Sequence, residues 1–366
     1  YMWRGNWGTG GWFNWGDSKG AEAFYPVRGE NLELTYIKRK EFSATARGAF
    51  FDNMVKAHVD FFLSEMSGLP VEKPTIYPDY FTTWYPEASM IPWINYNANR
   101  RTGLDFGVEF NKQFGDVKLN VGVVGTWYNT KATKRDEVNT YAYQNREGKP
   151  IDGIWGYQSA GIFQSPEEVA AWPDQSTLGS PAKPGDIKYV DQNGDKIIDS
   201  KDQVYLGKAG WYGSPFMLGL NFSVSFKGFT LFALGTGNWG ANASLAGNKY
   251  YYATGTDKYS AEMRNAWTPE TAATATLPRL TTESGANNTV QSDYWMYSTD
   301  AFRLGKLQLS YDMPESLMKK CHLTGAQIYV SGSNLFTISK NRKLLDRKIG
   351  AAPEYRFFNV GLSLSI

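Results

Sequence analysis

The sequence is poor in the residues that most metal and nucleophilic sites use. Among its 366 residues, Cys321 is the only cysteine, and His58 and His322 are the only histidines. A single cysteine excludes an internal disulfide and CxxC metal or redox chemistry. Two histidines far apart in the sequence argue against a zinc site and leave few candidates for a histidine-based triad.

Long apolar runs and an excess of charge are also missing. No stretch approaches the roughly 18 apolar residues of a membrane helix, which excludes a helical membrane protein. A membrane β-barrel stays possible, because its strands carry their lipid-facing side in alternating sequence. Lys plus Arg number 38 against 36 Asp plus Glu, so the charge balance gives no electrostatic case for binding nucleic acid.

The sequence is rich in alternating apolar and polar residues from residue 39 onward. Three pairs of alternating runs are joined by two residues each, at 52–53, 115–116 and 227–228. Such pairs predict β-hairpins with tight turns. Three more runs predict further strands, at 301–313, 326–336 and 354–366. In the last run one face holds the apolar residues Phe358, Val360, Leu362, Leu364 and Ile366.

The connections between these strands alternate between short and long. The long ones, at about 64–100, 131–215 and 239–300, are rich in Gly, Pro, Trp and Tyr. This alternation places all short turns at one end of a sheet, as in an outer-membrane barrel with short periplasmic turns and long extracellular loops. We predict an all-β fold, a portion of a transmembrane antiparallel β-barrel, with the C-terminus in the periplasm.

A soluble β-sandwich or propeller has the same alternation, with its apolar face turned inward. The corresponding alternative function is a secreted carbohydrate-binding or glycoside-hydrolase β domain. Two observations favour the barrel. Several polar faces carry only small uncharged residues, and single connections are longer than compact domains usually contain.

The C-terminal half resembles the barrel region of the SusC/RagA-like TonB-dependent outer-membrane transporters. The matching stretches are 184–231, 302–320, 328–340 and the closing strand. The resemblance implies residence in a Gram-negative outer membrane and import of oligosaccharides or peptides, with no enzymatic activity. It also implies a SusD-like surface lipoprotein as partner, and TonB–ExbB–ExbD acting through a plug segment.

The predicted organisation has two parts. Residues 1–38 are expected to form an aromatic, Gly-rich loop with a possible strand, and residues 39–366 the C-terminal portion of the barrel. The plug domain is absent from this chain, and about nine strands cannot close a barrel of the 22-stranded plugged kind. The chain starts at Tyr1 without an initiator Met or a leader, so we interpret it as processed or as a fragment that needs the remaining barrel and plug.

The stretch DQNGDKIIDSKD, at 191–202, has the spacing of a calcium loop. A large divalent cation takes six to eight oxygens, at loop positions 1, 3, 5, 7, 9 and 12. Lys196 stands where an EF-hand has glycine, and no amphipathic helix flanks the loop, so the prediction is a structural Ca²⁺ and not a switch. A solvated turn without any ion is the alternative. The predicted ligands are Asp191, Asn193, Asp195, the carbonyl of Ile197, Asp199 and Asp202.

Aromatic residues crowd the predicted loops. Flat aromatic faces stack on the apolar faces of sugar rings, which suits a glycan importer. Aromatics also form membrane-interface girdles and anchor loops to partners. Trp127, Tyr128 and Phe61, at strand ends, are predicted girdle residues. The predicted cargo-binding residues are Trp84, Tyr85, Trp93, Trp155, Trp211 and Tyr212.

Overall fold

The computed structural model describes residues 4–16, 19–82, 89–255, 257–282, 286–320, 322–347 and 352–365. In these residues strands predominate and the helices are short. No helix among them is long and apolar enough to cross a membrane. The strands are β1 Asn6–Trp15, β2 Lys19–Arg28, β3 Lys38–Phe50, β4 Val55–Glu72, β5 Trp93–Phe114, β6 Val117–Lys134, β7 Gly153–Gly156, β8 Ser159–Ile162, β9 Ile187–Tyr189, β10 Val204–Lys208, β11 Phe216–Phe226, β12 Phe229–Trp239, β13 Asn242–Ser244, β14 Met296–Ser298, β15 Ala301–Asp312, β16 Gly325–Ile338 and β17 Phe357–Ser365. The α-helices are α1 Pro166–Ala171, α2 Ala286–Thr289, α3 Glu315–Lys320 and α4 Arg342–Arg347.

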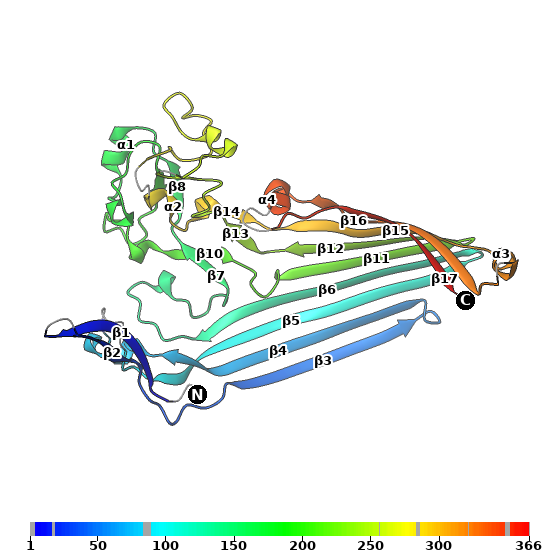
Figure 1. Ribbon diagram of the computed structural model, residues 1–366, viewed down its shortest axis with the longest axis horizontal. Helices are drawn as coiled ribbons and strands as arrows, with labels where there is room; N and C mark the ends of the chain where they lie inside the picture. Colours follow the sequence, from blue (N-terminus) through cyan, green and yellow to red (C-terminus); the bar gives the residue numbers. More distant parts are fainter. Residues whose placement is uncertain are drawn as a thin grey trace. The chain divides into compact units, whose positions relative to one another are not determined.

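Nine of the strands form one sheet, in the order β17-β16-β15-β12-β11-β6-β5-β4-β3. This order follows the chain, as the predicted hairpins require (Figure 1). Four two-stranded sheets accompany it: β1-β2, β7-β10, β8-β9 and β13-β14. The chain divides into two compact units, one of residues 1–43, 62–102 and 129–151, the other of 44–61, 103–128 and 152–366.

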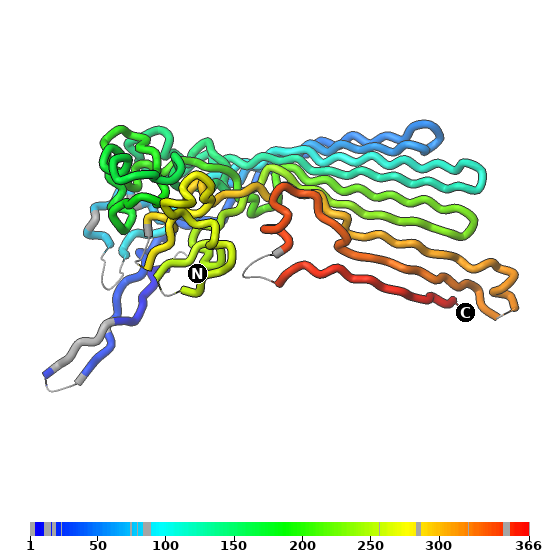
Figure 2. The backbone as a smooth tube through the Cα atoms, turned by 90° about the horizontal axis from the view of Figure 1, so that it is seen from above, coloured from blue at the N-terminus to red at the C-terminus, as the bar shows by residue number. Residues whose placement is uncertain are grey.

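The second unit has its short turns at one end and its long connections at the other. Figures 1 and 2 show the β5–β6 and β11–β12 turns at the end that also holds α3 and the C-terminus. Lys227 and Gly228 have φ of 46° and 85°, the left-handed values that a two-residue hairpin turn requires. The β3–β4 turn is longer than predicted: it occupies residues 51–54, and Met54 N–H donates to Phe51 O at 3.0 Å.

The main sheet has one apolar and one polar face, as the alternation predicts. In the β11–β6 ladder, Phe222 pairs with Val121 and Val224 with Leu119, while Ser223 pairs with Asn120. Farther along the sheet, Val330 of β16 pairs with Val360 of β17. Residues of the apolar face are exposed to different extents, Phe222 to 37% and Val360 to 78%.

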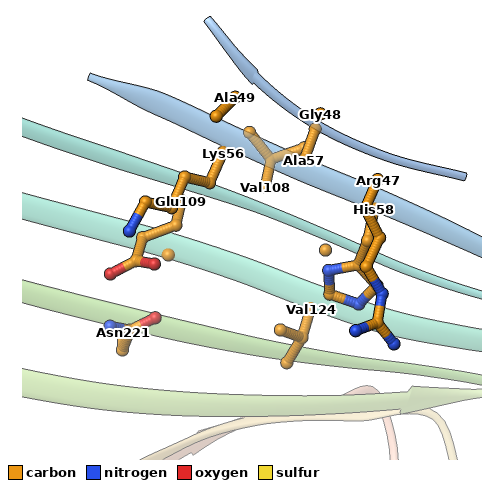
Figure 3. Close-up of a pocket in the computed structure, with 12 residues that line it drawn as sticks. Arg47, Gly48, Ala49, Lys56, Ala57, His58, Val108, Glu109, Val124 and Asn221 are labelled. Atoms are coloured by element: carbon orange, nitrogen blue, oxygen red, sulfur yellow. The ribbon is translucent and has the colours of Figure 1, made fainter. Parts of the chain in front are cut away.

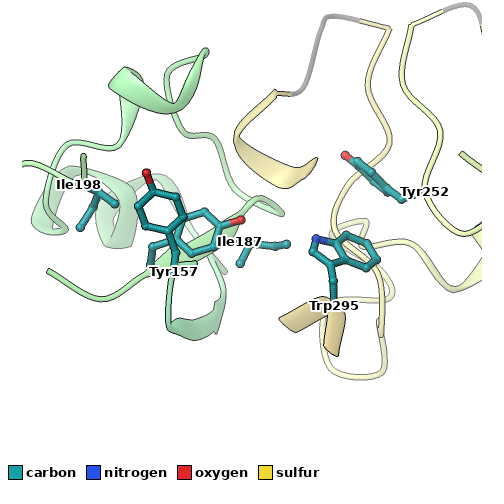
Figure 4. Close-up of a cluster of buried hydrophobic side chains, with 6 residues drawn as sticks. Tyr157, Ile187, Ile198, Tyr252 and Trp295 are labelled. Atoms are coloured by element: carbon teal, nitrogen blue, oxygen red, sulfur yellow. The ribbon is translucent and has the colours of Figure 1, made fainter. Parts of the chain in front are cut away.

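The long connections of the second unit, residues 152–215 and 240–300, pack together and are called the loop module below. A buried cluster at its centre joins both segments (Figure 4). Tyr189, Ile187 and Ile198 are completely buried, and Tyr252 and Trp295 nearly so. The loop module therefore has a hydrophobic core of its own.

In the first unit, β1 and β2 form a separate hairpin, with Asn14 opposite Gly20. The connection predicted at 64–100 is shorter in the structure, because β4 continues to Glu72 and β5 begins at Trp93. Sequence alternation did not reveal these strand extensions. Residues alternate between apolar and polar only where the two faces of a strand lie in different surroundings. The backbone hydrogen bonds between strands do not depend on this alternation, so a strand can extend beyond it.

Candidate functional site

A buried acidic residue ties the two segments of the loop module together. The side chain of Asp186 is fully buried, and Arg279 Nε lies 2.7 Å from its Oδ1. The Nη2 of Arg279 donates to Oδ2 at 3.3 Å. Asn288 Nδ2 donates to Oδ1 at 2.8 Å, and Asn287 Nδ2 to Oδ2 at 3.3 Å. A buried carboxylate is tolerated when it is paired and hydrogen-bonded in this way.

Buried tyrosines surround this network. Tyr189 donates its hydroxyl to Asn287 O at 2.7 Å, and Tyr252 donates to Arg279 O at 2.8 Å. Burial raises the pKa of Tyr252 to about 12 and raises that of Tyr189 further, since a buried phenol resists ionisation. These tyrosines stay neutral at physiological pH, and their hydrogen bonds help to hold the two segments of the loop module together.

The turn 209–215 presents two large aromatic side chains to solvent. Trp211 is 71% exposed and Tyr212 56%. The turn is tight: Gly213 N–H donates to Gly210 O at 3.0 Å, and both glycines have positive φ, 71° at Gly210 and 102° at Gly213. A Cβ on Gly210 would lie 2.7 Å from that of Ala241, so glycine is required there for close packing as well.

Neighbouring elements fix this turn. Asp152, which is buried, accepts from Gly210 N–H at 2.9 Å. Tyr128 donates its hydroxyl to Gly213 O, and its N–H donates to Pro215 O at 2.8 Å. The prediction that Tyr128 belongs to an exposed girdle is wrong, because its ring is 6% exposed and serves as this anchor. Of the other predicted girdle residues, Trp127 is exposed and Phe61 is half-buried.

The other predicted cargo-binding aromatics have different surroundings. Trp155 is half-buried in β7, edge-on to Tyr205 with 5.9 Å between the ring centres. Trp93 is the first residue of β5 and not a loop residue; its Nε1 donates to Glu72 Oε1 at 3.1 Å. Trp84 and Tyr85 lie outside the described residues. Only Trp211 and Tyr212, of the four that the structure describes, are largely exposed.

In the acidic loop 191–202, carboxylates accept hydrogen bonds from the backbone N–H groups of the loop itself. Asp191 accepts from the N–H of Gly194 at 2.7 Å and of Lys196 at 2.8 Å. Asp202 is fully buried and accepts from the N–H of Gln192 and Asp199, both at 2.8 Å. The loop is thus a set of Asx turns held at its end by a buried carboxylate.

Other contacts of this loop bear on the predicted calcium site. Lys196 has a φ of 67°, so it adopts the left-handed conformation for which an EF-hand uses glycine. Lys201 Nζ lies 3.5 Å from Asp195 and 3.3 Å from Asp199. Asn193 Nδ2 donates to Asp195, which is the main reason that the pKa of Asp195 is lowered. Among the described residues, no three His, Cys, Asp or Glu side chains gather as metal ligands. The calcium ion stays a prediction.

Two features of the second unit were missed in the sequence. The Asp186 network depends on contacts between residues about a hundred positions apart, which leave no local pattern. A hollow on the polar face of the sheet was also missed, although glycines inside alternating strands, at Gly107 and Gly122, were a signal for it.

The sequence is similar to two curated proteins of Formosa agariphila. It is 27% identical to TonB-dependent receptor P3 over 244 residues, which is 60% of this chain and 22% of that protein. It is 31% identical to TonB-dependent receptor P26 over 201 residues, which is 53% of this chain and 19% of that protein. The chain thus matches about a fifth of the length of these relatives. No family model matches the chain.

The fold is similar to that of solved transporter structures. The RagAB peptide importer in its open-open state matches the whole chain and 38% of its own chain, with a TM-score of 0.72 and 19% identity. A second structure, of the RagAB peptide transporter, matches with a TM-score of 0.71 and 19% identity over 39% of its chain. These structures confirm the all-β fold of a barrel portion. Together with the two curated relatives, they confirm the resemblance to the SusC/RagA-like TonB-dependent transporters.

Proposed function

We propose that this chain, a SusC/RagA-like relative of the TonB-dependent receptors, is part of an outer-membrane importer of oligosaccharides or peptides. The observation that carries the proposal is the main sheet: one apolar face, short turns at one end and a packed loop module at the other. A soluble β domain would bury its apolar face, whereas Val360 and Leu362 are 78% and 58% exposed. Lipid would cover them.

The membrane assignment is tested by fractionating cells that express the full-length product of the gene. We expect the protein in the outer-membrane fraction, extractable only with detergent. Accessibility of an introduced cysteine at Ser365 from the periplasm, and of one at Asp257 from the cell surface, tests the orientation. Recovery in the soluble fraction without detergent would reject the importer and favour the secreted β domain.

The import mechanism that we propose needs no covalent chemistry. Cargo would be captured between the loop module and a SusD-like lipoprotein, and TonB–ExbB–ExbD would act on a plug outside this chain. The similarity to a protein described as a peptide importer supports peptides as cargo, and the exposed aromatics support either class. Uptake of labelled peptides and oligosaccharides, with and without TonB, tests both statements; uptake that is unchanged without TonB would contradict the mechanism.

Trp211 and Tyr212 are the residues that we propose touch cargo. A rigid turn loses little entropy when it binds, and exposed aromatics on such turns are typical binding anchors. The substitution Trp211→Ala should weaken cargo binding by about tenfold, which corresponds to roughly 1.4 kcal/mol. Trp155→Ala is the matched control, with the smaller effect expected of a half-buried residue.

A structural Ca²⁺ in the loop 191–202 is a further part of the proposal. The residues fit an ion in part: Asp191 and Asp195 are close in sequence, Asp191 is half-buried and Asp195 exposed, and Lys196 has the required φ. Calcium would have to displace Lys201 Nζ from Asp195 and Asp199. Calorimetry of the native protein and of Asp191→Ala should show calcium uptake only in the native protein; equal heats would reject the site.

A further inference from the structure

A hollow of about 640 Å³ lies on the polar face of the sheet in the second unit (Figure 3). Its floor lacks side chains at Gly107 of β5 and Gly122 of β6. A Cβ on Gly107 would lie 2.2 Å from Cε1 of His58, and one on Gly122 would lie 1.9 Å from Oδ1 of Asn221. Glycine inside a strand weakens the sheet and often marks the close approach of a ligand or of another backbone.

One wall of the hollow carries two basic side chains directly opposite each other. Thr45 of β3 donates its hydroxyl to Asp60 of β4, so these two residues face each other. Two positions farther along the antiparallel pair, Arg47 faces His58 on the same side of the sheet. Figure 3 shows the guanidinium and the imidazole extending in the same direction. The N–H groups of both side chains can therefore donate to one ligand between them.

The acidic residues near the hollow have partners other than Arg47. Glu109 accepts from Asn120 Nδ2 at 3.0 Å, and Lys56 points toward it. Asp60 lies 4.0 Å from Nε2 of His58. Arg47 makes no ion pair with any residue that the structure describes. The guanidinium of Arg47 is therefore available to an anion from outside the described chain.

A neutral polar surface adjoins this charge. Asn221 Nδ2 donates to Asn120 Oδ1 at 3.0 Å, and Asn221 also lines the hollow. Amides offer both donors and acceptors, which suits an amide or hydroxyl group of a ligand. The hollow has the size of ordinary small-molecule sites, roughly 300–1,000 Å³.

We propose that this hollow binds the carboxylate of a small solute. Arg47 supplies the planar fork that matches a carboxylate in two parallel hydrogen bonds, His58 supplies one further N–H, and Asn221 contacts the uncharged remainder. The inference rests on the proposed function in one respect: an imported solute must reach the polar face of the sheet. It adds to that function a preference for carboxylate-bearing cargo.

The test measures equilibrium binding to the full-length protein purified in detergent. The probes are acetyl-Ala-Ala-Ala with a free C-terminal carboxylate and the same peptide with an amidated C-terminus. We expect the carboxylate peptide to bind about tenfold more tightly, because hydrogen bonds to a charged group are worth roughly 1.5–3 kcal/mol. Arg47→Gln should reduce the ratio of the two affinities to about one, and Arg47→Lys, without the fork, should leave an intermediate ratio.

Arg39→Gln is the matched control, because Arg39 lies on the same strand but does not line the hollow and is paired with Glu41. It should keep the native ratio. Gly122→Ala, which fills the floor, should weaken both peptides alike. Equal affinity of the native protein for both peptides, or a full preference in Arg47→Gln, would overturn the inference.

Binding in detergent requires neither TonB nor a lipoprotein, so the two proposals fail separately. A protein that shows the carboxylate preference but does not import would refute the proposed function alone. A protein that imports but shows no preference would refute the inference about the hollow alone. Unchanged thermal unfolding of Arg47→Gln confirms that any loss of preference is local.

Discussion

Within the second unit, the strands of the main sheet and the loop module differ in the exposure of their apolar side chains. In the sheet, Leu362 and Val330 are exposed, because none of the residues that the structure describes forms a second layer over them. In the loop module, Tyr189 and Phe163 are completely buried. The sheet is stable only if another medium covers its apolar face, while the loop module has the hydrophobic core of a water-soluble domain.

This contrast explains how the long connections can present binding residues in fixed positions. Long loops without structure of their own are usually mobile, and they carry function only when something positions them. In this protein the buried cluster and the Asp186 network, both inside the loop module, hold the long connections in place. The exposed turn of Trp211 is held by contacts to Asp152 and Tyr128.

The largest expected effect comes from Arg279→Ala. It leaves the Asp186 carboxylate buried with part of its pairing lost, which costs about 3–5 kcal/mol in comparable sites. Hydrogen exchange should speed up throughout the loop module while the strands of the sheet keep their protection. The double substitution Asp186→Leu with Arg279→Met, which removes both charges, should recover most of the stability. Uniform loss of protection in module and sheet would show that the two regions are not independent.

The next effect concerns the faces of the sheet. Phe222→Arg places a charge on the apolar face and should cost about 2–4 kcal/mol near the middle of a bilayer. Ser223→Arg, one residue away on the polar face, should be tolerated. The folded barrel in the outer membrane is quantified by its altered mobility in unheated gels. Equal losses for both variants would contradict the assignment of the faces.

Alkaline pH should destabilise the loop module before the sheet. Burial raises the pKa of Tyr252 from 10.0 to about 12, so above pH 10 the unfolded chain loses a proton that the folded chain keeps. The free energy of unfolding therefore falls between pH 10 and 12, by roughly 2–3 kcal/mol for this group, and is unaffected below that range. Tyrosinate absorbance followed against pH should rise together with loss of module structure. A fall that is as steep in Tyr252→Phe would point to other groups.

The smallest expected effect is that of Trp211→Ala on stability. Because the ring is largely exposed, unfolding should change by less than about 0.5 kcal/mol. Trp295→Ala, in the buried cluster, should cost about 3–5 kcal/mol. Thermal denaturation of both variants compares a binding residue with a core residue. A large loss for Trp211→Ala would mean that its ring is structural, and its proposed contact with cargo would lose support.

Sequence reasoning identified the strands well where the two faces differ. The β11–β12 hairpin, its turn at Lys227 and Gly228, and the order of nine strands were predicted from alternation alone. It failed at the outer parts of β4 and β5, where no alternation marks the strand, and at Tyr128, whose anchoring role depends on the distant residue Gly213.

The sequence by itself determined the alternation of strand faces, the short turns and the acidic loop, because each depends on residues close together in the chain. Only the tertiary structure decided which loop residues are buried and which are exposed. Asp186 meets Arg279 across 93 positions, and Tyr128 meets Gly213 across 85. Such contacts arise from packing between segments, so no local pattern of residues records them.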